Sequence, residues 1–258
     1  MEIITSFTLS IAGVNVSVNA DGYPGLLARP HVRYRGFLTG KRPALFLRVV
    51  KMRFGNAQNP VVKMPGKRGA MELRYARGGV CLGAGGKRGR IWADNEYVFD
   101  TLLRMLYSRL IAEKGGLLFH ASGLERKGRA RVFCGPSGSG KSTITRLGGK
   151  CRMLSDETTV IMRKKGAWLA FGTPFGGERQ GEAVNASGRL ESVVFPKRGR
   201  GFARRRVSEE EAAVALLKNA VFFTMETKAC SVALEICSSI AENVPCFEVR
   251  TDLKNMGG

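Results

Sequence analysis

Residues 131–143 read Arg-Val-Phe-Cys-Gly-Pro-Ser-Gly-Ser-Gly-Lys-Ser-Thr, and residues 135–142 within them match the phosphate-loop pattern G-x-x-x-x-G-K-[ST] at every position. Glycines let successive backbone N–H groups turn toward one phosphate, at a distance that side chains would block. A β-prone run precedes the loop, and residues 142–147 can form two helical turns before Gly148 and Gly149 end them. The stretch therefore predicts a strand, a phosphate-binding loop (Walker A) and a helix, in that order.

The ligand that such a loop predicts is a nucleoside triphosphate, with ATP as the expected one. Lys141 would bridge the β- and γ-phosphates, and the hydroxyl of Ser142 would ligate Mg²⁺. The other loop positions expected to surround the phosphates are Gly135, Pro136, Ser137, Gly138, Ser139, Gly140 and Thr143. The alternative is a glycine-rich turn that matches the pattern by chance.

A pair of carboxylates follows the loop closely. Asp156 and Glu157 end an apolar run, and Asp156 lies only 15 residues after Lys141. Phosphoryl transfer needs one carboxylate to hold Mg²⁺ and one to orient or deprotonate the attacking hydroxyl. Asp156 is the expected metal ligand together with Ser142, and which carboxylate is the base stays open. Alternatively, the pair only caps a turn between strands.

This short spacing resembles the HPr kinase/phosphorylase and phosphoenolpyruvate carboxykinase group of phosphate-loop proteins. The likeness rests on Phe-His-Ala-Ser at residues 119–122, on the loop, and on residues 154–157, where the family has a paired Asp-Asp. The resemblance implies that Asp156 and Glu157 are catalytic and that His120 lies near the transferred phosphate. His120 could instead be a core histidine bonded to the backbone. No loop signature for contact with HPr is found, so the acceptor stays open.

The chain is expected to be α+β, with a β-rich domain at residues 1–92 and an HPr-kinase-like phosphate-loop domain with a mixed sheet at residues 93–258. Alternation in residues 3–20 predicts half-buried strands, and Asp94 is a candidate cap for a helix with an apolar stripe to residue 111. Ser208 and Glu211 form a capping box for a helix to about residue 220. The remaining expected strands are residues 44–54, 61–64, 71–75, 80–82, 117–122, 130–134, 153–154, 158–163, 167–171, 192–195 and 246–250.

Charge is uneven along this basic chain of 258 residues, which has 42 Lys and Arg against 21 Asp and Glu. Residues 1–90 hold 16 basic and 3 acidic side chains, and the remainder holds 26 and 18. The electric field of such a positively charged chain attracts nucleic acid, anionic lipid or an acidic protein or metabolite. The alternative explanation for the charge is a general excess of basic residues in the proteins of the source organism. The partners expected are a nucleotide and an acidic protein or small-molecule acceptor, with nucleic acid the weakest candidate because no aromatic-and-basic RNA signature occurs. A homo-oligomer stays open.

The six cysteines form no C-x-x-C pair, and with two histidines in the chain a structural zinc site is not expected. Neither a signal peptide nor an apolar run long enough to span a bilayer is found, which favours a cytoplasmic protein with reduced thiols. Residues 83–90 predict a hairpin tip or a basic loop rather than a second phosphate loop. The three arginines at residues 204–206 could form an arginine finger or a solvated basic face. Glu178 and Arg179 could belong to an acceptor pocket or to an ordinary loop.

The sequence leaves three possible functions open. The first is an ATP- and Mg²⁺-dependent kinase that acts on a serine or another hydroxyl. The second is a binding module that holds nucleotide or phosphate as a signal without transfer, which the Glu at position 157 favours because the family has Asp there. The third is a nucleic-acid-dependent ATPase.

Overall fold

The computed structural model describes residues 6–20, 30–50, 71–136, 138–141, 143, 149–177, 180–221 and 227–251. The chain divides into two compact units, Met1–Leu110 and Ile111–Gly258. Both units are mixed α/β, consist mostly of strands and contain a mixed sheet, as the sequence predicted at this coarse level. The division falls after Leu110 rather than near residue 92, because the helix that begins at Glu96 packs on the first sheet.

The sheet of the first unit mixes parallel and antiparallel strands. The β2–β3 and β3–β6 pairs are parallel, and the other pairs are antiparallel. The alternation predicted for residues 3–20 is confirmed for the described residues 6–20, since buried and half-buried residues alternate along β2, and residues 3–5 lie outside the described residues. The predicted hairpin at residues 83–90 is also confirmed, with its second strand beginning at Arg88, whereas the expected strand at residues 61–64 lies outside the described residues. In spatial order the strands are β1 (Ser6–Ile11), β2 (Val14–Asn19), β3 (Leu45–Val49), β6 (Arg88–Ala93), β5 (Gly78–Leu82) and β4 (Met71–Tyr75).

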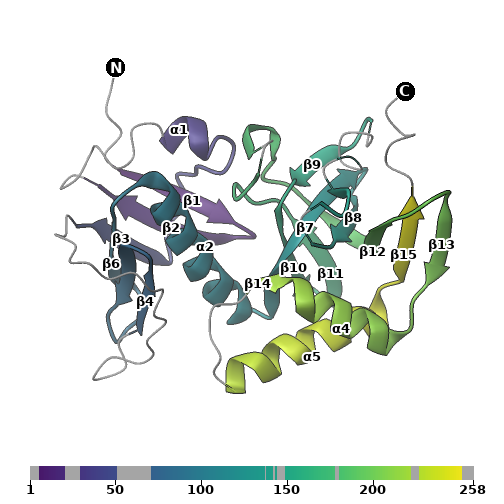
Figure 1. The fold of residues 1–258 in the computed structure, drawn as a ribbon. Coiled ribbons are helices and arrows are strands. Elements are labelled where there is room, and N and C mark those ends of the chain that lie inside the picture. Colours follow the sequence, from purple (N-terminus) through teal and green to yellow (C-terminus); the bar gives the residue numbers. More distant parts are fainter. Residues whose placement is uncertain are drawn as a thin grey trace. The chain divides into compact units, whose positions relative to one another are not determined.

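Helix α2 (Glu96–Ala112) packs against this sheet (Figure 1). The Tyr107 hydroxyl donates to the Leu9 carbonyl oxygen at 2.8 Å, and a Cβ added at Gly78 would lie 2.6 Å from Val98 Cγ1. Only glycine therefore permits β5 to approach the helix this closely.

The N-terminus of α2 is capped by Asn95, whose Oδ1 accepts from the Val98 N–H at 3.0 Å. The prediction that Asp94 is the cap was wrong by one residue. The cap oxygen comes from the residue three positions before the free N–H of Val98, which is Asn95. One turn further along, the buried Asp100 accepts hydrogen bonds from Arg33, the last residue of the short helix α1 (Pro30–Arg33), and from Tyr34, which follows it. A paired and hydrogen-bonded carboxylate can be buried in this way.

The second unit has a larger sheet in which β8, β12 and β15 run parallel to one another. The other pairs are antiparallel, and β11 pairs with both β10 and β12, so this part of the strand path closes on itself. The main path is β11 (Ala167–Phe171), β10 (Thr158–Lys164), β7 (Gly116–Arg126), β8 (Arg129–Cys134), β12 (Ser187–Arg198), β15 (Cys246–Thr251) and β13 (Ala203–Arg206), and β9 (Arg152–Ser155) and β14 (Ala220–Val221) pair with β7.

Helices α4 (Glu209–Asn219) and α5 (Thr227–Asn243) lie side by side against this sheet (Figure 1). Their buried residues, among them Leu216, Ile236 and Ile240, share one core with Phe119 and Val193 of the strands. The capping box of Ser208 and Glu211 is confirmed, with the Glu211 N–H donating to Ser208 Oγ at 3.2 Å. A short 3₁₀ turn, η2 (Gln180–Glu182), follows β11.

Every cysteine of the chain is a free thiol in the structure. Cys134, Cys237 and Cys246 are buried in the core of the second unit, and burial raises the pKa of Cys237 and of Cys246 to about 12. These thiols are therefore packing residues that stay protonated at neutral pH. Among the described residues, no helix combines the length and apolar character needed to cross a membrane.

Candidate functional site

The phosphate-loop sequence begins at the carboxyl end of β8, directly after Cys134. Gly138 and Gly140 have positive φ values of 77° and 100°, which residues with side chains rarely adopt. Thr143 is half-buried, and the loop residues Ser137 and Ser142 lie outside the described residues. The loop thus starts after a strand as predicted, and the role of Ser142 in metal binding stays a prediction.

Lys141 is folded against its own loop. Its side chain is buried, and its Nζ donates to the Gly135 carbonyl oxygen at 2.6 Å and to the Pro136 carbonyl oxygen at 2.8 Å. Burial lowers the pKa of Lys141, and the charge of Glu157 acts in the opposite direction.

The carboxylates of Asp156 and Glu157 both lie beside Gly177, in the loop after β11. The Gly177 N–H donates to Asp156 Oδ1 at 2.9 Å. A Cβ added at Gly177 would lie 3.1 Å from Glu157 Oε2 and 3.4 Å from Asp156 Oδ2. Sequence reasoning missed this contact of Gly177, although the glycine-rich run at residues 172–177 was a signal for a close backbone approach.

The turn between β9 and β10 is capped by Ser155. Its Oγ accepts from the N–H groups of Glu157 at 3.2 Å and Thr158 at 3.0 Å. Ser155 therefore caps this turn, whereas Asp156 accepts a hydrogen bond from the separate loop at Gly177.

His120 lies on β7, next to the strands that carry the other predicted residues. It is half-buried and stands opposite Thr158 in the strand register. Its neighbour Ala121 pairs with Cys134, and the Ala121 N–H donates to the Glu157 carbonyl oxygen at 2.8 Å. The three sequence-predicted parts, the start of the loop, the carboxylate pair and the histidine strand, thus meet at one end of the sheet.

Magnesium would have to be held by few protein ligands. In the described part of the chain, no group of three or more His, Cys, Asp or Glu side chains could hold a metal ion. Mg²⁺ is commonly bound by one or two carboxylates, phosphate oxygens and water, so the Asp156 and Glu157 pair is sufficient for such a site.

The arginines at residues 204–206 form the edge strand β13, paired with β15. The Arg204 guanidinium lies 3.8 Å from the centre of the Phe247 ring, and Arg205 forms ion pairs with Glu211 at 2.8 Å and with Glu248 at 3.1 Å. All residues of β13 are exposed, so the segment is a solvated basic face, one of the two suggestions, with Arg204 and Arg205 also in contact with the sheet and α4. The suggestion of an arginine finger stays a prediction. The two other candidates, Glu178 and Arg179, lie outside the described residues.

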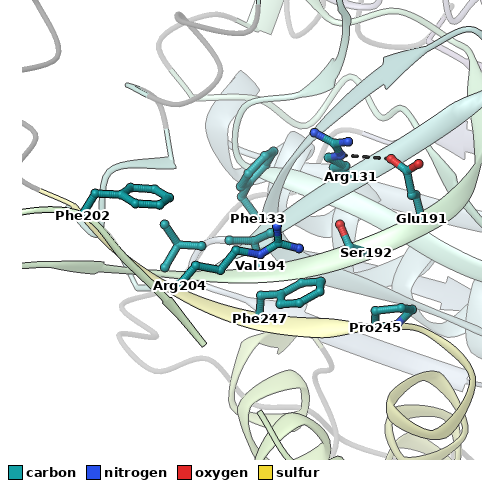
Figure 2. Close-up of a pocket in the computed structure, with 10 residues that line it drawn as sticks. Arg131, Phe133, Glu191, Ser192, Val194, Phe202, Arg204, Pro245 and Phe247 are labelled. Atoms are coloured by element: carbon teal, nitrogen blue, oxygen red, sulfur yellow. Dashed lines mark hydrogen bonds and ion pairs between the residues drawn. The ribbon is translucent and has the colours of Figure 1, made fainter. Parts of the chain in front are cut away.

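A pocket of about 510 Å³ lies over β8, β12, β15 and β13 (Figure 2). Its floor is apolar, and Arg204 covers Phe247 at one end while Arg131 contacts Glu191 at the other. The sequence did not predict this pocket, because its residues come from strands far apart in the chain. The lining residues are Arg131, Phe133, Glu191, Ser192, Val194, Phe202, Arg204, Pro245, Phe247 and Val249.

Taken together, the chain is a mixed α/β protein whose second unit carries a phosphate-loop sequence beside a carboxylate pair. Residues 96–256 match the model of the family described as SynChlorMet cassette protein ScmC. Since the match covers more than half of the chain, the protein belongs to the ScmC family. Comparison with curated proteins gives no match.

Proposed function

We propose that the protein is an ATP- and Mg²⁺-dependent phosphotransferase that acts on a serine or another hydroxyl, related to the HPr kinase group. The observation that carries the proposal is that Lys141 lies in a complete phosphate-loop sequence directly after β8, and that Ala121, which pairs with Cys134 at the end of β8, donates its N–H to the Glu157 carbonyl oxygen at 2.8 Å. A cation on the loop and an acidic pair beside it are the two parts that phosphoryl transfer requires.

The loop residues fit a phosphate. A side chain at Gly135 would displace the Ser139 hydroxyl, because an added Cβ would lie 2.7 Å from Ser139 Oγ. That hydroxyl is buried and has no hydrogen-bond partner among the described residues. Buried polar atoms without partners are uncommon, so a ligand oxygen is a reasonable partner for Ser139.

The acidic pair fits a magnesium ion and a base. Asp156 would be the metal ligand, helped by Ser142, and the ion would neutralise charge on the phosphates when bound. Glu157, whose Oε2 is beside Gly177, would then be the second carboxylate at the acceptor. The choice between Asp156 and Glu157 as base depends on where the acceptor hydroxyl binds.

In the proposed reaction, one carboxylate of the pair accepts the proton of the acceptor hydroxyl. The hydroxyl oxygen forms a bond to the terminal phosphorus as the bond from that phosphorus to the bridging oxygen of ATP breaks, which leaves ADP. The ammonium of Lys141 can pass from the carbonyl oxygens of Gly135 and Pro136 to phosphate oxygens, because it has three N–H donors. His120, one strand away, would lie near the transferred group.

A second candidate is a module that binds nucleotide or phosphate without transfer. It is favoured by Glu157, which replaces the second Asp of the resembled family and whose carboxylate is one methylene longer. The same loop and the same Lys141 would serve it, so binding alone does not separate the two functions.

The test is a phosphotransfer screen with labelled ATP, Mg²⁺, and the soluble proteins and metabolites of the host as acceptors. The parent is expected to transfer label, Lys141→Met to bind MgATP at least about 100-fold more weakly, and Asp156→Asn to bind it but transfer slowly. Transfer by Asp156→Asn at the parent rate would contradict its role. Tight MgATP binding with no transfer to any acceptor would favour the binding module, and no binding would refute both.

A further inference from the structure

Strand β12 extends past the end of β8 and runs beside the phosphate loop. The two strands are parallel, with Val194 opposite Phe133, so the last residues of β12 lie at the level of the loop. A Cβ added at Gly135 would lie 3.7 Å from Pro196 Cδ, which confirms the close approach. In open α/β sheets, ligands bind at the carboxyl ends of parallel strands, and this is that end.

Arg198, the last residue of β12, points its guanidinium at the loop. A Cβ added at Gly138 would lie 3.6 Å from Arg198 Nη2. Because strand residues alternate between faces, Arg198 shares a face with Val194, whereas Lys197 points to the other face and forms an ion pair with Glu248 at 2.6 Å. The position of Arg198 follows from the strand register and not from a general basic surface.

The guanidinium of Arg198 is not neutralised by any described residue. The side chain is exposed and forms no hydrogen bond or ion pair within the described part of the chain. Glu248, on the neighbouring strand β15, is already shared by Lys197 and Arg205. An arginine without a carboxylate, beside a loop of backbone N–H groups, is a ready partner for an anion.

We infer that Arg198 is a phosphate-binding residue of this site, and that it contacts the phosphates of the nucleotide from the Gly138 side of the loop. This rests on the proposed function, because it needs a phosphate on the loop. Lys141 approaches the same phosphates from within the loop, so the ligand is held by two cations from different elements. Two such contacts also fix the direction of the phosphate chain, since the guanidinium presents a planar pair of donors.

The experiment measures the affinity of the whole protein for MgATP and for inorganic tripolyphosphate by calorimetry. The variants are Arg198→Ala, Arg198→Lys, and Arg200→Ala as the matched control, which removes the same charge from an exposed position two residues further along. Arg198→Ala is expected to bind both ligands about 10- to 100-fold more weakly, as for the loss of a hydrogen bond between charged groups. Arg198→Lys should recover part of this loss, and Arg200→Ala should stay within about twofold of the parent.

The melting temperature of each ligand-free variant separates lost binding from lost folding. Because Arg198 is exposed and has no partner among the described residues, its replacement should leave the melting temperature unchanged. An Arg198→Ala variant that melts at the same temperature as the parent and binds both ligands as tightly would overturn the inference. Equal losses in Arg198→Ala and Arg200→Ala would also overturn it, because they would show only the general basic field. If the parent binds MgATP and Lys141→Met does not, the proposed function survives either result, whereas a parent that binds neither ligand refutes both.

Discussion

The contact between Gly135 and Ser139 gives a direct test of the loop geometry. A Cβ added at Gly135 would lie 2.7 Å from Ser139 Oγ and 3.3 Å from Ser139 Cβ. The first distance is a steric overlap, and the second needs only a small shift. Gly135→Ala is therefore expected to lower the free energy of unfolding by about 1–3 kcal/mol, as overpacking does in other buried sites.

The overlap depends on one oxygen atom, so a second change should relieve it. Ser139→Ala removes a buried hydroxyl that has no partner among the described residues, and alone it should be neutral or stabilising by up to about 1 kcal/mol. In the double variant most of the cost of Gly135→Ala should disappear, which gives a coupling energy of about 1–2 kcal/mol between the two positions. The affinity for MgATP should fall in Gly135→Ala.

The assay is urea unfolding followed by tryptophan fluorescence. Trp168 is buried in the core of the second unit, whereas Trp92 belongs to the first unit, so the series is made in a Trp92→Phe background that reports one unit only. A single reporter matters because two units need not unfold together. If Gly135→Ala is as stable as the parent, or if Ser139→Ala does not rescue it, the described loop geometry is wrong.

Three further changes test the framework around the site by the same unfolding assay. Gly172→Ala would place a Cβ against the Val184 carbonyl oxygen and should lower the free energy of unfolding by at least about 3 kcal/mol. The control Gly181→Ala, which has open space around it, should be nearly neutral. Equal effects of the two changes would contradict the packing of the loop. The hydrogen bond from Arg152 holds the pKa of Glu125 below its usual value, so this interaction stabilises the fold at neutral pH. The stabilisation is lost as the pH falls below about 4.3 and through the folded-state pKa of Glu125. Glu125→Gln should make the free energy of unfolding depend less on pH in this range, and a pH profile like the parent's would refute the role of Glu125. Ser208→Ala should cost about 0.5–2 kcal/mol through loss of the α4 cap, and an unchanged value would show that the cap contributes nothing.

Much of the fold follows from local pattern. Alternation along β2, the strand before the loop and the capping box of α4 are visible in the sequence because each depends on neighbours a few residues apart. Helix α5 was missed, although Ala233, Ile236, Cys237 and Ile240 follow helical spacing and are buried. The spacing of these four residues is therefore sufficient to predict the helix.

Other features depend on pairing between distant segments. Strand β13 is a run of exposed residues with no strand pattern, and it is a strand because β15 supplies its hydrogen bonds. The contact of Asp156 with the distant Gly177 and the cap that Ser155 provides to the turn before β10 are two further examples. No local rule contains either contact.

By itself the sequence determined the phosphate-loop motif, the short spacing to Asp156 and most of the strands, because these depend on residue type and on distance along the chain. Only the tertiary structure decided that Gly177 donates a hydrogen bond to Asp156, that Glu157 lies beside the same glycine and that Arg198 faces Gly138. The physical reason is that strand register brings together side chains that lie tens of residues apart, and register is set by the packing of the whole sheet.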